Sequence, residues 1–342
     1  MAGAEAGMSA GRPTILDVAA LSGVSKSTVS NVIRGTQAVS PPVRDRVLAA
    51  VAELGYRPNG IARQLVQRRT STLGVLVGDL GNPFYGELVK LLERHAHADG
   101  FTTMVCNTEG SPELEAARVE AFLERRVAGM ALLQLSGDDA VLDVLEAESV
   151  PTVVVSSTDA RVDSVGVDEQ RGVSLAVGHL AALGHRRLAY VTSAYVEERT
   201  NHARHTSFAA ACTAHGCEEA PPAHLDVDAV LAGGSVGLDR GATGFVAAND
   251  LTAIALVEAL GRDGRAVPRD ASVVGFDGIA LTALAGVGLT TVAQPREEMA
   301  RVGARMLLER IADHAGPPRQ VVLEPELVVR TTTGPPPGRS EG

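Results

Sequence analysis

The spacing of hydrophobic residues divides the chain into two parts that meet near Leu73. In the first part, apolar residues recur every three or four positions, which is the period of amphipathic helices. These stretches predict three short helices over residues 14–22, 25–32 and 42–54, and Thr14 and Ser40 are expected to cap the first and the third. Two short helices joined by a glycine-containing turn and closed by a third are typical of a helix-turn-helix unit.

From Leu73 onward, short apolar runs alternate with amphipathic segments. The runs predict strands over residues 73–77, 102–106, 127–135, 150–155, 187–192, 244–247 and 271–276. A repeated strand–helix pattern favours an α/β fold in which helices cover both faces of parallel sheets. About 260 residues of this pattern exceed one typical domain, so we expect two lobes.

The charge of the chain is unevenly distributed. The 342 residues carry a net charge of −10, but residues 11–70 hold nine Lys and Arg against three Asp and Glu. The first part therefore has a charge of +6 and the remainder −16. A basic head joined to an acidic body indicates an anion-binding module fused to a second function.

Several classes of protein are excluded by what the sequence lacks. Its three cysteines are odd in number and sparse, which excludes a disulfide scaffold and fits a reducing compartment. No stretch of 18 mostly apolar residues occurs, and residues 1–11 lack the apolar core of a secretory signal. We therefore expect a cytoplasmic protein with no membrane partner.

Neither a cofactor nor a metal is expected. The sequence contains no G-x-G-x-x-G and no G-x-x-x-x-G-K-[ST] motif. His95 and His97, at i and i+2, would lie on different sides of a helix. His202 and His205 could share a face, but no Cys or third His completes a zinc set.

One motif is consistent with an enzyme: residues 233–237 satisfy the G-x-S-x-G pattern of a nucleophile elbow. That motif needs a strand before it and a helix, an acid and a histidine after it. Here the preceding apolar run is short, and only His314 lies downstream. We therefore expect the chain not to be an enzyme.

Residues 14–35 read Thr-Ile-Leu-Asp-Val-Ala-Ala-Leu-Ser-Gly-Val-Ser-Lys-Ser-Thr-Val-Ser-Asn-Val-Ile-Arg-Gly. This segment closely resembles the helix-turn-helix of lactose-repressor (LacI) family transcription regulators. Further ordered matches lie at residues 39–40, 54–59, 62–65, 81–84, 166–168, 179–187, 248–250, 273–277, 289–294 and 329–330. The resemblance spans residues 14–333 and implies a λ-repressor-like helix-turn-helix head joined to a two-lobed, periplasmic-binding-protein-like α/β body.

The pattern and the resemblance together predict the domain boundaries. We expect a flexible leader over residues 1–12, a DNA-binding domain over 13–58, a hinge helix and linker over 59–71, and a disordered tail over 334–342. The effector-binding and dimerisation domain would occupy 72–333. Its first lobe would combine about 72–160 with 294–324, and its second 161–293 with 325–333.

The second predicted helix carries the residues suited to reading DNA. Asn and Lys side chains can read purine edges in the major groove, and Ser and Thr hydroxyls can bond phosphates, while Val24, Val29 and Val32 would face inward. The resemblance places Lys26, Ser27 and Asn31 at operator-reading positions, although many family members carry Arg where Asn31 stands. The candidate DNA-binding residues of the head are Thr14, Ser25, Lys26, Ser27, Thr28, Ser30 and Asn31.

The resemblance also implies a hinge helix that folds when two subunits sit on DNA. Leu65 matches the leucine that the family inserts into the minor groove, and Ala62 matches the small residue that lets two such helices approach. An apolar wedge of this kind unstacks a base step and kinks the duplex. Asn59, Ala62 and Leu65 complete the predicted DNA-binding set.

The resemblance implies an effector site between the two lobes. The candidate residues carried over by position are Asp79, Phe84, Tyr85, Ser156, Arg204, Asn249, Asp277 and Gln294. Acids, amides and an Arg around an aromatic ring suit a sugar. Alternatively, Asn249 and Asp277 cap a helix or order a loop. Ser156, where relatives often place an acid, and the two histidines beside Arg204 leave a phosphorylated, acidic or nucleoside-like effector open.

The predicted function is that of a ligand-responsive transcription regulator, and we expect this chain to be a repressor. Its partners would be double-stranded operator DNA with a pseudo-palindromic sequence, a small sugar-like effector, and a second copy of the chain in a dimer or higher assembly. The alternative is a small-molecule receptor that does not bind DNA. That alternative leaves the basic charge of residues 11–70 unexplained.

Overall fold

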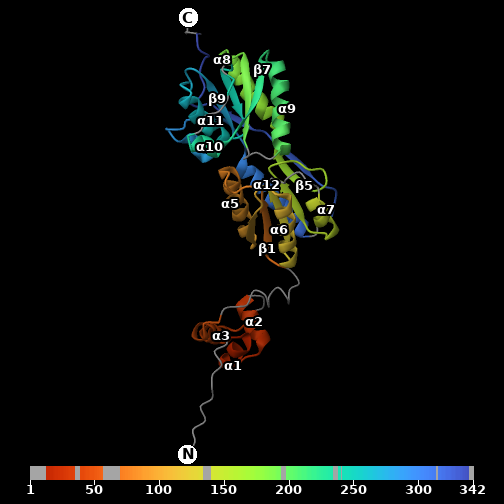
Figure 1. The fold of residues 1–342 in the computed structure, drawn as a ribbon. Coiled ribbons are helices and arrows are strands. Elements are labelled where there is room, and N and C mark those ends of the chain that lie inside the picture. The colour runs from red at the N-terminus through yellow and green to blue at the C-terminus, as the bar shows by residue number, and fades with distance from the viewer. Residues whose placement is uncertain are drawn as a thin grey trace, which may run out of the picture. The chain divides into compact units, whose positions relative to one another are not determined.

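The computed structural model describes residues 13–34, 39–56, 70–133, 140–193, 198–233, 238–239, 241–312 and 315–338. The chain divides into two compact units, residues 1–70 and 71–342 (Figure 1). The predicted leader and the predicted hinge residues Asn59, Ala62 and Leu65 lie outside the described residues.

The first unit contains the three predicted helices, α1 (Ile15–Ser22), α2 (Lys26–Arg34) and α3 (Pro41–Leu54). Thr14 and Asp17 form a reciprocal capping box at the start of α1, so the predicted cap is confirmed. Ser40 occupies the N-cap position of α3, but its side chain makes no capping hydrogen bond. The predicted start of α3 after Ser40 is confirmed, but the predicted capping hydrogen bond from the Ser40 side chain is wrong. The helices enclose a small core of Val18, Val29, Val32, Val47 and Ala50.

The second unit begins with a six-stranded parallel sheet in the order β11-β5-β4-β3-β1-β2. Its strands are β1 (Thr72–Val77), β2 (Thr102–Asn107), β3 (Gly129–Leu133), β4 (Thr152–Val155), β5 (Asp163–Val167) and β11 (Gln320–Leu323). Helices α5 (Pro83–Ala98) and α12 (Arg296–Ile311) cover one face, and α6 (Pro112–Glu124) and α7 (Ala140–Ala147) cover the other. The sheet is therefore buried on both sides, as a parallel sheet requires.

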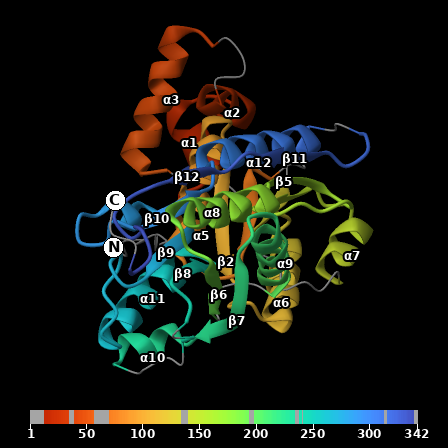
Figure 2. The same cartoon turned by 90° about the horizontal axis from the view of Figure 1, so that it is seen from above.

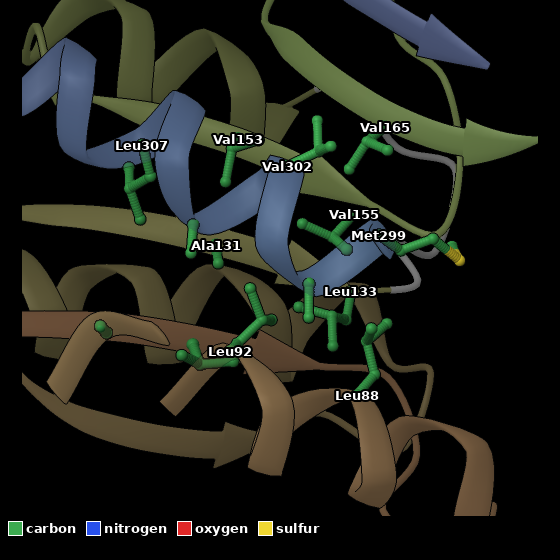
Figure 3. Close-up of a cluster of buried hydrophobic side chains, with 14 of the residues drawn as sticks. Leu88, Leu92, Ala131, Leu133, Val153, Val155, Val165, Met299, Val302 and Leu307 are labelled. Atoms are coloured by element: carbon green, nitrogen blue, oxygen red, sulfur yellow. The ribbon is translucent and has the colours of Figure 1, made fainter. Parts of the chain in front are cut away.

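The last long helix returns to the first lobe and completes its core. Figure 3 shows Met299, Val302 and Leu307 of α12 against strand residues such as Val153, with Leu88 of α5 beside them. All five are nearly inaccessible to solvent. Truncation of one such leucine to alanine typically costs about 2–5 kcal/mol of unfolding free energy. The first lobe thus depends on a helix that lies more than a hundred residues after its central strands.

The second lobe repeats this architecture in a sheet ordered β12-β10-β9-β8-β6-β7 (Figures 1 and 2). Its strands are β6 (Arg187–Ser193), β7 (Glu218–Leu225), β8 (Gly244–Ala247), β9 (Ser272–Asp277), β10 (Thr290–Ala293) and β12 (Glu326–Val328), of which only β12 runs antiparallel among the described pairs. Helices α8 (Glu169–Leu183) and α9 (Glu198–Ala214) cover one face, and α10 (Val227–Leu231) and α11 (Asp250–Arg262) the other, with a 3₁₀ turn η1 (Ala280–Ala283) after β9. No helix of the described chain is both long enough and apolar enough for a membrane crossing.

Two predicted boundaries differ from the structure. Strand β5 belongs to the first sheet, so the first lobe extends to Val167 rather than ending at residue 160. The buried Asp163 side chain holds it there through ion pairs with Arg310 and Arg319, which both belong to the first lobe. Gly334, assigned to the disordered tail, accepts a hydrogen bond from Ser272 in the second lobe, and the described chain continues to residue 338.

Candidate functional site

Helix α2 presents polar side chains on the face opposite its buried valines. Val29 and Val32 lie in the core of the head, as predicted, whereas Lys26 and Ser27 are exposed in the first turn. The N-terminal end of a helix carries unsatisfied N–H groups and a partial positive charge, both of which attract phosphate. This end of α2 therefore combines a cation, a hydroxyl and a helix terminus on an accessible surface.

Ser25 lies just before α2 and orders its first turn. Its Oγ accepts a hydrogen bond from the Thr28 N–H at 3.1 Å and lies within 2.8 Å of the hydroxyls of Ser27 and Thr28. Ser30 and Asn31, one turn further along the helix, are half-buried. The predicted DNA-reading residues of α2 are thus held on one short, well-capped helix.

Thr14, the remaining predicted DNA-binding residue in the head, is exposed at the start of α1. Its hydroxyl donates to Asp17 Oδ2 at 2.7 Å, and its backbone N–H donates to the same oxygen at 2.7 Å. These hydrogen bonds lower the pKa of Asp17, with the backbone bond the larger cause. In the head alone, Thr14 therefore stabilises α1.

In the second lobe, Arg204 of α9 is the centre of a buried charged cluster. Its side chain is 4% exposed and makes a two-point ion pair with Glu169, at 2.7 Å and 3.0 Å. The guanidinium also donates to the Ala248 carbonyl, lies 3.8 Å from Asp277 Oδ1, and stacks 3.8 Å from the centre of the Phe276 ring. Burial alone would lower the pKa of Arg204, but the attraction of Glu169 raises it above its ordinary value.

Asp277 and Gln294 meet at the ends of two adjacent strands, β9 and β10. Gln294 Nε2 donates to Asp277 Oδ1 at 2.8 Å, and both side chains are buried. Burial raises the pKa of Asp277 to about 6, although Arg204 and Gln294 partly offset this effect. Asp277 adopts a φ of 113°, in the region that disfavours side chains, and such strained residues concentrate at functional sites.

Asn249 and Asp250 follow strand β8 at the start of α11. Asn249 Oδ1 accepts a hydrogen bond from the Thr252 N–H at 2.8 Å, which makes Asn249 the N-cap of that helix. Asp250 is fully buried and accepts hydrogen bonds from the Ile279 N–H and the Thr291 hydroxyl. Burial and repulsion from Asp277 raise the pKa of Asp250 to about 8. The contact of Asn249 with Thr252 therefore agrees with the alternative that Asn249 caps a helix.

The predicted residues of the first lobe are more loosely held, with one exception. Phe84 is 1% exposed and belongs to the hydrophobic core, so it packs inside the lobe rather than offering its ring to a ligand. Tyr85 is half-buried and lies edge-on to Phe84 at 5.1 Å between ring centres. Asp79 is half-buried and accepts from the Gly81 N–H, and Ser156 is half-buried with a φ of 86°.

Residues outside the predicted set connect the two lobes. The Asn82 side chain, from the turn after β1, lies close enough to the Asp277 carboxylate to favour its ionised form and so lower its pKa. Glu87 of α5 accepts from the Ala280 N–H at 3.2 Å and lies 3.0 Å from Arg296 Nε. Asn82 was recognisable as a short polar residue after a predicted strand, but Glu169 and Glu87 gave no signal because their partners lie far away in the sequence.

The order of the strands explains why these residues meet. In each sheet the order reverses at its first strand: β1 lies between β2 and β3, and β6 lies between β7 and β8. Open parallel sheets bind ligands outside the carboxyl ends of their strands at such a reversal. Asn82 lies in the turn after β1, and Asp277 is the last residue of β9. The residues that follow β3 and β6, 134–139 and 194–197, lie outside the described residues.

The two histidines beside Arg204 differ in their surroundings. His202 is exposed, whereas His205 stacks on Tyr190 at 5.2 Å and lies 2.9 Å from Glu219. Within the described ranges, no group of three His, Cys, Asp or Glu residues is placed to hold a metal ion. Most of the G-x-S-x-G segment, 234–237, lies outside the described residues.

Comparison with known proteins agrees with this architecture. Residues 14–59 match the family described as "Bacterial regulatory proteins, lacI family", and residues 177–333 match the "Periplasmic binding protein-like domain". The HTH-type transcriptional repressor PurR of Aliivibrio fischeri (strain MJ11) is 32% identical over 332 residues, which cover 93% of this chain and 98% of that protein.

Solved structures give the same result. The lac repressor dimer bound to operator and the anti-inducer ONPF has a TM-score of 0.82 at 26% identity, covering 95% of this chain and 100% of that one. The complex of the transcriptional regulator CelR with cellobiose has a TM-score of 0.67 at 30% identity, covering 94% and 100%. These relatives are transcription regulators rather than enzymes, so the nucleophile-elbow alternative is set aside. The chain belongs to the lacI family of bacterial regulatory proteins.

Proposed function

We propose that this protein is a repressor that binds a pseudo-palindromic operator as a dimer. Binding of a small polar effector would raise or lower its affinity for the operator. The observation that carries the proposal is helix α2, whose exposed Lys26 and Ser27 lie at a capped helix start opposite the buried Val29 and Val32. A short amphipathic helix with this face fits the major groove. The relatives named above include a lac repressor dimer bound to operator.

The effector would bind where the carboxyl ends of the two sheets meet. Asn82 of the first lobe and Asp277 of the second lie close enough to interact across this junction. A ligand that contacts both sides would favour one relative position of the lobes over another, and so shift the DNA-competent population. Because CelR is seen with cellobiose, a sugar or a related polar metabolite is the effector class we expect.

The proposed place of action is the cytoplasm, where the operator would be. The three cysteines are unpaired, which suits a reducing compartment.

The hinge prediction belongs to the same proposal: Leu65 would enter the minor groove and Ala62 would permit close helix approach. Leu65→Ala should then reduce DNA bending along with affinity, and undiminished bending would count against the wedge.

The test exploits the fact that lysine occurs only twice in the chain, at positions 26 and 90. Lys26 is exposed on α2 and Lys90 is exposed on α5 of the effector domain. Fluorescence anisotropy with operator duplex should show that Lys26→Ala weakens binding by about 1–3 kcal/mol, whereas Lys90→Ala changes it little. Equal effects of the two substitutions would contradict the proposed reading helix. Failure of the folded parent chain to bind any duplex at low salt would instead favour the non-DNA-binding receptor.

A further inference from the structure

The buried cluster of the second lobe contains more acidic than basic groups. Among the described residues, Glu169 and Asp277 flank the guanidinium of Arg204, and Asp250 lies close enough to Asp277 for the two carboxyl groups to repel each other. The other guanidinium that reaches this junction belongs to Arg296, and it is neutralised by Glu87. Burial in a medium of low dielectric constant makes such an excess of negative charge costly unless a ligand or a proton offsets it.

The hydrogen-bonding groups of the cluster are also unbalanced, because Arg204 and Gln294 use their donors while the Gln294 oxygen stays unpaired among the described residues. Arg204 directs Nε, Nη1 and Nη2 to Glu169 and the Ala248 carbonyl. Gln294 is 6% exposed and gives its Nε2 to Asp277, while its Oε1 has no hydrogen-bond partner among the described residues. Buried polar atoms are normally paired, so an orphaned acceptor beside a carboxylate marks a position for a donor from a ligand.

A second orphaned group, the Tyr190 hydroxyl, lies near Arg204. Tyr190 is 1% exposed, its hydroxyl has no partner among the described residues, and it is close enough to Arg204 and Glu169 to interact electrostatically with both. Thr192 Oγ1, two residues further along the same face of β6, is likewise buried without a described partner. Gln294 and Tyr190 thus both lie near the Arg204 centre, and Thr192 adds an unpartnered hydroxyl on the strand that carries Tyr190.

We propose that the effector is a polyhydroxylated amine of the amino-sugar class, which carries a protonated amine and no anionic group. The inference rests on the proposed function, because it names the ligand of the same site. Hydroxyl and ammonium groups can donate to the orphaned Gln294 Oε1, and ligand hydroxyls can also pair with the Tyr190 and Thr192 hydroxyls, which both donate and accept. The ammonium charge offsets the excess of carboxylates through charge-assisted hydrogen bonds. A phosphate or carboxylate would add a negative charge to the cluster, whose described cations, Arg204 and Arg296, are already paired with Glu169 and Glu87. The proposal therefore disfavours the phosphorylated and acidic effectors left open by the sequence.

The test compares ligands that share a ring but differ in charge. Isothermal titration calorimetry at pH 7 with the full chain would use glucose, glucosamine and glucose 6-phosphate, and then the galactose and mannose series. In at least one series, the amine should bind at least about tenfold tighter than its neutral parent, or about 1.4 kcal/mol, and the phosphate at least about a hundredfold weaker than the amine. A phosphate that binds as well as the amine, or no binding by any of the three amines at about 10 mM, would overturn the proposal.

Substitution of Glu169 tests which group selects the amine. Glu169→Gln keeps the shape of the side chain and removes its charge, so the ratio of amine to neutral affinity should fall at least about threefold. Glu258→Gln, on the exposed face of α11 in the same lobe, should leave this ratio unchanged. A purely structural role of Glu169 would alter stability without moving the ratio, and an unchanged ratio in a folded Glu169→Gln variant would contradict its assignment.

The outcomes for effector and operator remain separable. A chain that binds its operator but none of the amines keeps the proposed function and loses this inference. A chain that binds an amine but no duplex keeps the inference on the ligand and loses the proposed function. Both measurements use the same preparation of the full chain.

Discussion

The two lobes contribute different kinds of residue to the candidate effector site. In the second lobe, Arg204, Asp250 and Asp277 are almost fully buried, and each is fixed by partners before any ligand arrives. In the first lobe, Tyr85 and Ser156 are half-buried and more weakly held. At the proposed site, the second lobe would therefore set the charge and the geometry, and the first would contribute less buried side chains.

The largest expected effect comes from breaking the buried pair of the second lobe. Arg204→Ala leaves Glu169 and Asp277 without their cation, and removal of one partner from a buried pair typically costs about 3–5 kcal/mol. Urea unfolding measures this loss. The matched control is Arg94→Ala, which removes the exposed partner of Glu297 in the first lobe and should cost less than about 1 kcal/mol. Similar costs for the two variants would contradict the contrast between the lobes.

The second expected effect is in the pH dependence of stability. The folded-state pKa of Asp250 is raised to about 8 from an ordinary 3.8, so the native protein binds more protons than the unfolded chain between these values. Stability should therefore fall as pH rises from 4 to 8, by about 1.4 kcal/mol for each unit of pKa shift that solution conditions preserve. Asp250→Asn should flatten this fall in the urea midpoint. Parallel pH profiles for the parent and the variant would show that Asp250 is not protonated in the native state.

The aromatic pair of the first lobe gives a third comparison. Phe84→Leu changes a core side chain and should cost about 1–1.5 kcal/mol of stability, with effector affinity nearly unchanged. Tyr85→Leu, on the less buried neighbour, should show the opposite pattern: little loss of stability and a measurable loss of effector affinity. Differential scanning fluorimetry and calorimetry separate the two quantities. If Phe84→Leu weakens the effector more than Tyr85→Leu does, the core assignment of Phe84 does not describe its role.

The smallest effect is expected at the contact between the lobes. Glu87→Gln weakens the pair with Arg296, whose groups are one-fifth to one-third exposed, so the stability change should stay within about 1 kcal/mol. The same substitution should nevertheless change the effect of ligand on operator affinity, because Glu87 also accepts a hydrogen bond from the Ala280 N–H of the second lobe. Anisotropy titrations with and without effector measure this coupling. An unchanged coupling would place the transmission of the signal elsewhere.

The head was predictable from sequence because its determinants are local. Thr14 and Asp17 are three residues apart and form the capping box within one turn. The buried Val29 and Val32 also share one short helix, so their period could be recognised directly. Only the Ser40 side chain departs from the local expectation.

The missed features of the body depend on distant partners. Strand β5 is held by Asp163, whose ion-pair partner Arg319 lies 156 residues further along the chain. Strand β7 includes Pro221 and Pro222, which argue against a strand in sequence but are tolerated at the sheet edge that β7 forms. The Glu169–Arg204 pair spans 35 residues and has no periodic signature. Matching positions to the family was enough to select Arg204 and Asp277 as candidate site residues. It could not show whether the Phe84 ring is buried in the core or faces a ligand.

The central claim is that this chain reads a two-fold symmetric DNA sequence through α2, and selection from a pool of random duplexes tests it most directly. The account predicts enrichment of a pseudo-palindrome with two half-sites, and Asn31→Ala should relax the preference at one base position in each half-site at a cost of about 1–3 kcal/mol. A folded protein that enriches no sequence, or whose enriched sequence is unchanged by substitutions at Lys26 and Asn31, would contradict the claim.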